Sequence, residues 1–187
     1  GENKYKEIIT YGDLNKRVNA LSNFFLGQGI KKGDVVVGYL PNIPDTIISF
    51  LSAAKIGAVW SSCSADFGTQ AVIDRFSQLK PKLLIIADHY FYNGKKFHYS
   101  KNLRLLKQKL NNPRVLKTSY PSNKSTSQLK KIVTQKKYKT INQHVLLDFN
   151  HPLYVLFSSG TTGLPKCITH GHGGSLLQHL KELALHT

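Results

Sequence analysis

Three short apolar runs at regular spacing constrain the fold of this chain more than any other feature. They occupy residues 34–40, 58–63 and 82–87, and each has the length of a buried strand. Each gap between two runs contains apolar residues at helical spacing: Ile47, Ile48, Leu51 and Ala54 in the first, and Val72, Phe76 and Leu79 in the second. Strands that alternate with helices are typical of βαβ units. We therefore predict an α/β fold, with a mostly parallel sheet flanked by helices on both faces.

Further elements are predicted on either side of this repeat. Thr10 to Asp13 resembles a capping box with Asp in place of Glu, and it predicts a helix that Gly27 and Gly29 end. After the third strand we expect a helix over 100–110 and a short strand near 115–116. A strand from about 152 and a helix over 175–185 complete the prediction. Between that short strand and about residue 150, no pattern predicts an element.

A loop rich in hydroxyls and glycines follows the apolar run 153–157. It consists of Ser158, Ser159, Gly160, Thr161, Thr162, Gly163, Leu164, Pro165 and Lys166. Glycine lets backbone N–H groups approach a ligand, and a concavity of such groups attracts anions. Lysine can meet a phosphate as a point charge. A hairpin turn with one solvated lysine is the simpler interpretation, but the combination of hydroxyls, proline and preceding strand favours phosphate binding. The spacing differs from G-x-x-x-x-G-K-[ST], because Lys166 follows Gly163 by three residues.

The loop resembles the phosphate-binding loop of the adenylate-forming superfamily, which includes acyl-CoA synthetases and luciferases. That loop is a run of Ser, Thr and Gly followed by Gly-x-Pro-Lys, and residues 158–166 match it at every defining position. Within the superfamily, residues 60–68, 92–95 and 173–182 are most similar to the acetoacetyl-CoA synthetases. The similarity covers nearly all of the chain except about 119–142. It covers only the front part of the family's length.

The resemblance implies an ATP-dependent acid–thiol ligase that activates acetoacetate as an acyl-adenylate and transfers it to CoA. An acetyl-CoA or other short-chain acyl-CoA synthetase is the alternative. Ser158, Ser159, Gly160, Thr161, Thr162, Gly163 and Lys166 would bind the nucleotide phosphates, and Mg²⁺ would bridge those phosphates.

The family's adenine, ribose and Mg²⁺ motifs would lie beyond Thr187, as would its late catalytic lysine. We therefore expect residues 1–187 to be part of an N-terminal AMP-binding domain. The C-terminal domain would be absent, and the piece would be inactive alone. No metal ligand, and no catalytic residue beyond the loop, is expected within it.

A second candidate site follows the third strand. Acetyl-CoA synthetase-like relatives use a glycine-flanked arginine turn there to bind CoA, and the corresponding residues are Asn93, Gly94, Lys95 and Lys96. Lysine can meet a CoA phosphate, although without the bidentate fork of arginine. A plain β-turn with two solvated lysines is an equal alternative.

The charge of the chain is concentrated in one segment. The net charge is +16, and fourteen Lys or Arg but no Asp or Glu lie between Lys95 and Lys139. We interpret about 95–142 as a solvated basic insertion; a polyanion-binding module is the rival. Nucleic acid is not the favoured partner, because the aromatic platform of single-strand binders is missing.

Two properties of the sequence favour a cytosolic protein without a membrane span. No stretch approaches 18 consecutive apolar residues, the length that predicts a membrane span. Cys63 and Cys167 lie far apart, which fits a reduced cytosolic chain.

Other reactive side chains have weaker patterns. His170, His172 and His179 have no acidic or cysteine partner at a spacing typical of a metal site. We expect Cys167 to be a small packed residue on a strand and not a nucleophile. Three serines at the carboxyl end of the second strand either line a ligand cleft or form a plain loop: Ser61, Ser62 and Ser64.

Overall fold

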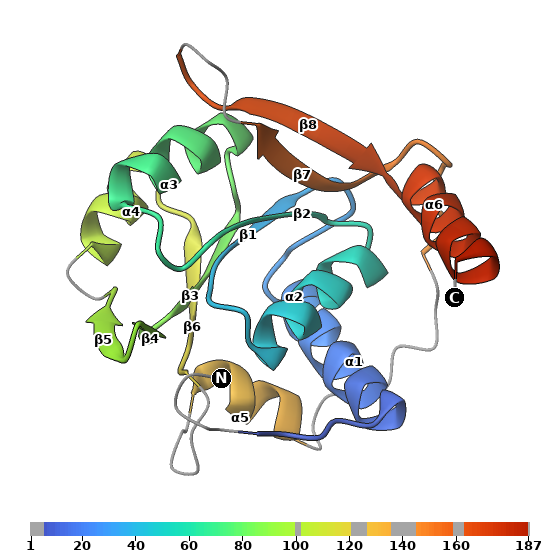
Figure 1. The fold of residues 1–187 in the computed structure, drawn as a ribbon, viewed down its shortest axis with the longest axis horizontal. Helices are drawn as coiled ribbons and strands as arrows, with labels where there is room; N and C mark the ends of the chain where they lie inside the picture. Colours follow the sequence, from blue (N-terminus) through green and yellow to red (C-terminus); the bar gives the residue numbers. More distant parts are fainter. Residues whose placement is uncertain (1–5, 100–101, 121–126, 136–144, 159–162, 187) are drawn as a thin grey trace.

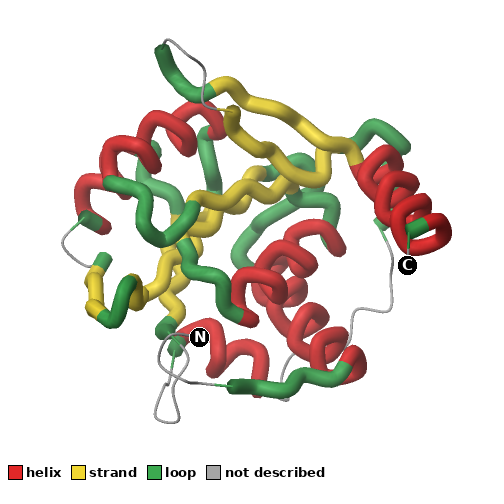
Figure 2. The backbone as a smooth tube through the Cα atoms, in the orientation of Figure 1, coloured by secondary structure: helices red, strands yellow, loops and turns green. Residues whose placement is uncertain are grey.

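A six-stranded, mostly parallel sheet forms the centre of the molecule. The computed structural model describes residues 6–99, 102–120, 127–135, 145–158 and 163–186. The strand order is β6-β3-β1-β2-β7-β8, and only β8 runs antiparallel to its neighbour (Figures 1 and 2). The strands are β1 Val35–Tyr39, β2 Val59–Cys63, β3 Leu83–Ala87, β6 Arg114–Thr118, β7 Pro152–Ser158 and β8 Lys166–Gly171. The predicted α/β class is confirmed, and the four predicted strand starts are each within one residue of those observed.

Helices cover both faces of this sheet. One face carries α1 Tyr11–Gly27, α2 Pro44–Lys55 and α5 Gln128–Thr134. The other carries α3 Thr69–Phe76, the short 3₁₀ helix η1 Ser77–Leu79, and α4 Leu103–Lys109 (Figure 1). Right-handed crossovers explain this division. The chain crosses the sheet in one direction from β1 to β2 and in the opposite direction from β2 to β3, so the helices of the two crossovers lie on opposite faces.

Local sequence explains where the first helix begins and ends. The Thr10 side chain accepts a hydrogen bond from the backbone N–H of Asp13 at 3.1 Å, as the capping-box interpretation predicted. The helix ends at Gly27, and Gly29 adopts φ +77°, a left-handed conformation that side chains rarely adopt.

The core is closely packed around the central strands. Val36, Val37 and Leu84 are fully buried. A Cβ atom on Gly38 would lie 2.7 Å from Cη2 of Trp60, so glycine is required where the indole crosses β1. The sheet is therefore a rigid support for the loops at its strand ends.

Sequence patterns missed three features. A second sheet pairs β4 His89–Tyr92 with β5 Lys95–His98, where only a turn was expected. The helix α5 was not predicted, and α6 His172–Leu185 begins three residues earlier than expected.

The described parts of the basic segment contribute leucines to the core. These are Leu106, Leu110, Leu116 and Leu129. The side chains of Lys95, Lys96, Arg104 and Lys107 are exposed. That the segment is an insertion stays a prediction. Within the described ranges, no helix is both long and apolar enough to cross a membrane.

Candidate functional site

The candidate phosphate loop joins two antiparallel strands. Ser158, the last residue of β7, pairs with Lys166, the first residue of β8. Four of its predicted phosphate-binding residues lie outside the described part of the chain: Ser159, Gly160, Thr161 and Thr162. The described ends of the loop are therefore Ser158 and residues 163–166.

Gly163 has a positive φ, and Lys166 begins β8. Gly163 adopts φ +96°, and no atom lies within 4 Å of a Cβ built there. Glycine is thus required by backbone conformation and not by lack of space. Lys166 is exposed on β8, directly after Pro165, whose ring fixes its own φ. A cation at the exit of a glycine-containing turn can meet an anion held by backbone N–H groups.

Gln78 on η1 holds the exit of the loop. Its side-chain nitrogen donates to the Pro165 carbonyl at 3.0 Å, and its side-chain oxygen accepts from the Cys167 thiol at 3.5 Å. The predicted strand position of Cys167 is correct, but the predicted packing is wrong, because its side chain is exposed. Sequence analysis missed Gln78 because contacts between residues 87 and 89 positions apart leave no local pattern.

The three serines at the end of β2 differ in their surroundings. Ser61 is buried and donates to the Val155 carbonyl at 2.7 Å, so its hydroxyl links β2 to β7. Ser62 and Ser64 are exposed. Neither the cleft nor the plain loop therefore describes all three residues.

The candidate CoA turn is the tip of the β4–β5 hairpin. Asn93 and Gly94 both have positive φ, 48° and 71°, which is the two-residue type I′ geometry that Asn-Gly favours. The side chains of Lys95 and Lys96 are exposed and free of the core. Figure 1 shows this hairpin beside α4, well away from the ends of β7 and β8 that flank the candidate phosphate loop, so the two candidate sites are separate.

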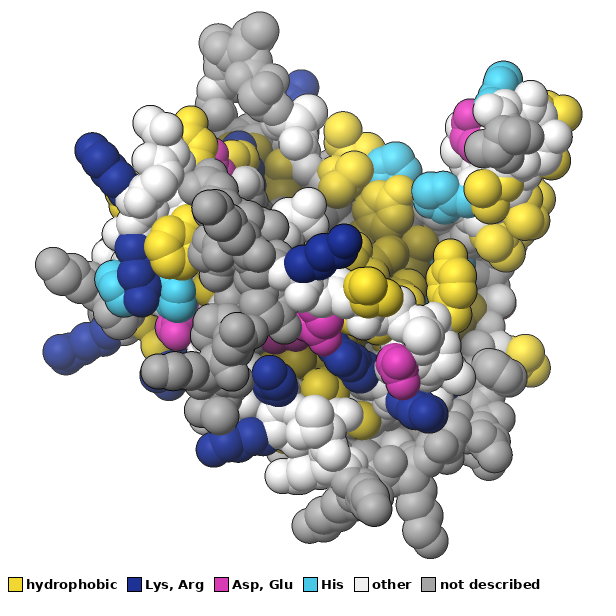
Figure 3. Space-filling view, turned by 60° about the horizontal axis from the view of Figure 1, so that its bottom comes forward, with side chains coloured by type: hydrophobic (Ala, Val, Ile, Leu, Met, Phe, Trp, Pro, Cys, Tyr) yellow, Lys and Arg dark blue, Asp and Glu magenta, His cyan; other side chains and the backbone are white. Residues whose placement is uncertain are grey.

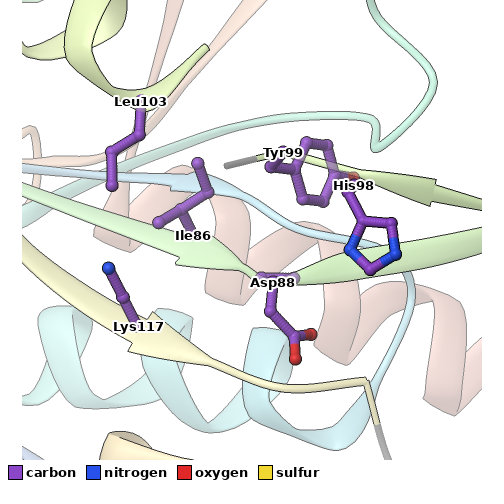
Figure 4. A pocket seen from close by; sticks show the side chains of 7 residues that line it. Ile86, Asp88, His98, Tyr99, Leu103 and Lys117 are labelled. Atoms are coloured by element: carbon purple, nitrogen blue, oxygen red, sulfur yellow. The ribbon is translucent and has the colours of Figure 1, made fainter. Parts of the chain in front are cut away.

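A small cavity that sequence analysis missed lies at the base of this hairpin. It has a volume of about 180 Å³, with Ile86 and Leu103 on its apolar side and Asp88, His98 and Lys117 among its polar lining (Figure 4). The carboxylate of Asp88 also accepts hydrogen bonds from His89 at 2.7 Å and from the backbone N–H of Tyr120 at 3.1 Å. Burial lowers the pKa of His89, although Asp88 opposes the shift. The cavity can take a small, partly apolar group.

A wider apolar hollow lies between α6 and the body of the molecule. Its volume is about 630 Å³, and Phe50, Phe149, Tyr154 and Leu176 are among the residues that line it (Figure 3). His172 lines it too, and burial lowers its pKa, with a further contribution from His151.

Two of the three histidines singled out in the sequence, His170 and His172, pack against other rings, whereas His179 is exposed. His170 stacks on Tyr154 with ring centroids 4.9 Å apart, and His172 lies 5.7 Å from His151. Across the described ranges, no three His, Cys, Asp or Glu side chains form a group that could hold a metal ion.

The chain is similar to a known protein family and to several characterised proteins. Residues 4–186 match the family model described as AMP-binding enzyme. The acetoacetyl-coenzyme A synthetase of Rhizobium meliloti is 43% identical over 197 residues, which covers 100% of this chain and 30% of that protein. The acetoacetyl-CoA synthetase of Macaca fascicularis is 40% identical and is covered over 28% of its length.

Solved structures agree with this relationship. The acetoacetyl-CoA synthetase from Streptomyces lividans matches with a TM-score of 0.88 at 36% identity, over 99% of this chain and 29% of that one. The apo form of MatB from Rhodopseudomonas palustris matches with a TM-score of 0.77 at 16% identity, which shows a shared fold. The chain thus spans about 30% of the length of its relatives. Because the matched model extends over almost all of its residues, the chain belongs to the AMP-binding enzyme family.

Proposed function

We propose that these residues are the phosphate-binding part of an ATP-dependent acetoacetate–CoA ligase. The observation that carries the proposal is the loop between β7 and β8, closed by the Ser158–Lys166 pair and ending in Gly-x-Pro-Lys. Support for acetoacetate comes from relatives named acetoacetyl-CoA synthetase that match nearly the whole chain at 40–43% identity. The activity would belong to a chain of the relatives' full length, because these residues span about 30% of it.

The loop would act on the first half-reaction, in which the acid attacks ATP and pyrophosphate leaves. Negative charge then develops on the leaving phosphates, and preorganised donors stabilise it more strongly than they stabilise bound ATP. Backbone N–H groups of the loop, the hydroxyl of Ser158 and the ammonium of Lys166 are the donors we assign to it. We propose that Mg²⁺ bridges the nucleotide phosphates in this step.

The second half-reaction needs CoA, and we assign its phosphates to the tip of the β4–β5 hairpin. Lys95 and Lys96 are exposed there, directly after the two-residue turn of Asn93 and Gly94. Each ammonium can meet a phosphate of CoA as a point charge. The cytosolic location predicted from the sequence stays a prediction.

Exchange of radiolabelled pyrophosphate into ATP tests the proposal. A full-length chain that carries these residues should catalyse exchange when acetoacetate is added, and more slowly with acetate. Equal rates with acetate, or exchange independent of any acid, would contradict the assignment of acetoacetate. The 187-residue chain alone is the matched control and should show no acid-dependent exchange.

A further inference from the structure

One side chain outside the loop contacts the chain on both sides of Lys166. Gln78 donates from Nε2 to the carbonyl of Pro165, the residue before the lysine, at 3.0 Å. It accepts at Oε1 from the thiol of Cys167, the residue after the lysine, at 3.5 Å. Gln78 therefore bridges the point where the candidate loop re-enters the sheet.

The third contact of this amide anchors it to α3. Nε2 of Gln78 also donates to the carbonyl of Asp74 at 2.7 Å, in the last turn of that helix. A carboxamide has two N–H donors, and both face carbonyl oxygens here. The opposite amide orientation would place oxygen against two carbonyl oxygens, so the orientation is determined. The helix itself is fixed by Val72 and Phe76, which are fully buried.

The backbone of Lys166 is consequently held from two sides. On one side it pairs with Ser158 in the β7–β8 ladder, and on the other the flanking residues are tied to η1 through Gln78. The lysine side chain is exposed and long, so the position of its backbone sets the region that its ammonium can reach.

We propose that Gln78 is a positioning residue of the phosphate loop, which holds the Pro165–Lys166 peptide so that the ammonium of Lys166 meets the outer phosphates of ATP. The inference rests on the proposed function and adds a residue from a different element to that site. Gln78 itself touches no reacting atom; it acts through Lys166.

Replacement of the amide should slow adenylation without unfolding the chain. A net hydrogen bond shifts an equilibrium by about 3- to 12-fold, so Gln78→Ala should lower kcat for pyrophosphate exchange by about that factor. The KM for ATP should change less, because a misplaced lysine weakens contacts that grow as pyrophosphate leaves. Gln78→Met keeps the length but not the donors and should behave like Gln78→Ala. Gln108→Ala, an exposed glutamine on α4, is the matched control for solubility and folding.

A double-mutant cycle in the full-length chain separates positioning from a general structural effect. If Gln78 acts through the lysine, adding Gln78→Ala to Lys166→Ala should cause no further loss. Losses that multiply would overturn the inference. If Lys166→Ala alone leaves exchange unchanged, the proposed function of the loop fails. If Lys166→Ala slows exchange while Gln78→Ala does not, only the positioning role fails.

The contact can also be measured without activity, in the 187-residue chain. The chain has two cysteines, and Cys63 is buried, with a pKa raised to about 12 chiefly by that burial. Alkylation by iodoacetamide, read by mass spectrometry, therefore reports on the exposed Cys167. Gln78→Ala should accelerate alkylation at Cys167, because the thiol loses its acceptor, whereas Gln108→Ala should not. Equal rates in all three proteins would show that the Gln78 bridge does not form in solution and would overturn the inference.

Discussion

Lys166 is the one charged residue of the candidate phosphate loop, and its contribution to the rate depends on whether its contacts with phosphate strengthen during the reaction. A solvated lysine contributes equally little before and during reaction. A lysine aimed at the outer phosphates gains interaction as the pyrophosphate charge develops. The structure supplies the rigid backbone that the second case needs, because Lys166 begins a strand and follows a proline.

We predict that Lys166→Ala in the full-length enzyme lowers kcat for adenylation by roughly 10²–10³, the scale for loss of one preorganised charge-stabilising donor. Lys166→Arg should recover part of this, since a planar fork is not a point charge. Thioester formation from preformed acetoacetyl-adenylate should change much less, because no pyrophosphate leaves in that step. Single-turnover kinetics of each half-reaction measure both effects. Small and equal losses in the two steps would identify Lys166 as a solvated surface lysine.

At the scale of elements, a partly buried carboxyl links α2 to the edge of the sheet. Asp45 lies in the first turn of α2, and its carboxylate accepts a hydrogen bond from the hydroxyl of Thr118 at the end of β6. Burial raises the pKa of Asp45 above its ordinary value of 3.8, and the Thr118 hydrogen bond opposes the shift. Folding therefore stabilises the neutral acid of Asp45 relative to its carboxylate.

This shift predicts the sign of a pH effect on stability. Because the folded-state pKa lies above the unfolded one, the folded chain holds more of this proton than the unfolded chain does at pH values above 3.8. The contribution of Asp45 to stability therefore falls as the pH rises from 3.8 through the folded-state pKa. Asp45→Asn mimics the neutral acid and should become more stable than the parent as pH rises to neutrality. Urea unfolding of the 187-residue chain across the window measures the difference. The prediction fails if the variant instead loses stability relative to the parent on going to neutral pH.

The elements that sequence predicted are those whose pattern is local. The strands β1, β2 and β3 are continuous apolar runs, and the helices between them have clear apolar stripes, so they were placed almost to the residue. The hairpin β4–β5 was missed because each of its strands has only four residues, and these include histidines and lysines that are not typical of a buried strand. The helix α5 was missed because its seven residues follow a stretch of Ser, Asn, Thr and Pro that is typical of a loop, and only Leu129 and Ile132 are buried in it.

Sequence likewise predicted only those parts of the candidate site that belong to a local motif. Gly163 and Lys166 belong to one contiguous motif, so sequence alone indicated them. Gln78 and the Asp88 cavity depend on contacts between distant segments, which only the fold brings together.

At the scale of the whole molecule, two surfaces differ in character. The surface of α4 and of the edge strand β6 carries exposed basic residues, whereas leucines of the same two elements pack into the core. By contrast, α6 has no buried residue, and its leucines are largely exposed: Leu176, Leu177, Leu180 and Leu183. An apolar helix face of this kind is unusual on a protein surface.

Binding of a fluorescent probe can test whether the hollow beneath α6 is open in solution. The hollow combines an opening of about 630 Å³ with an apolar lining, so the 187-residue chain should bind the fluorescent probe ANS there. Replacing Leu176, a lining residue that is 59% exposed, by Gln should lower the fluorescence, because the probe loses apolar contact area. Leu105→Gln is the matched control, since Leu105 is 43% exposed on α4. Similar fluorescence in the parent and both variants would show that the probe binds elsewhere. Such a result would contradict the prediction that the hollow beneath α6 is the binding site of the probe.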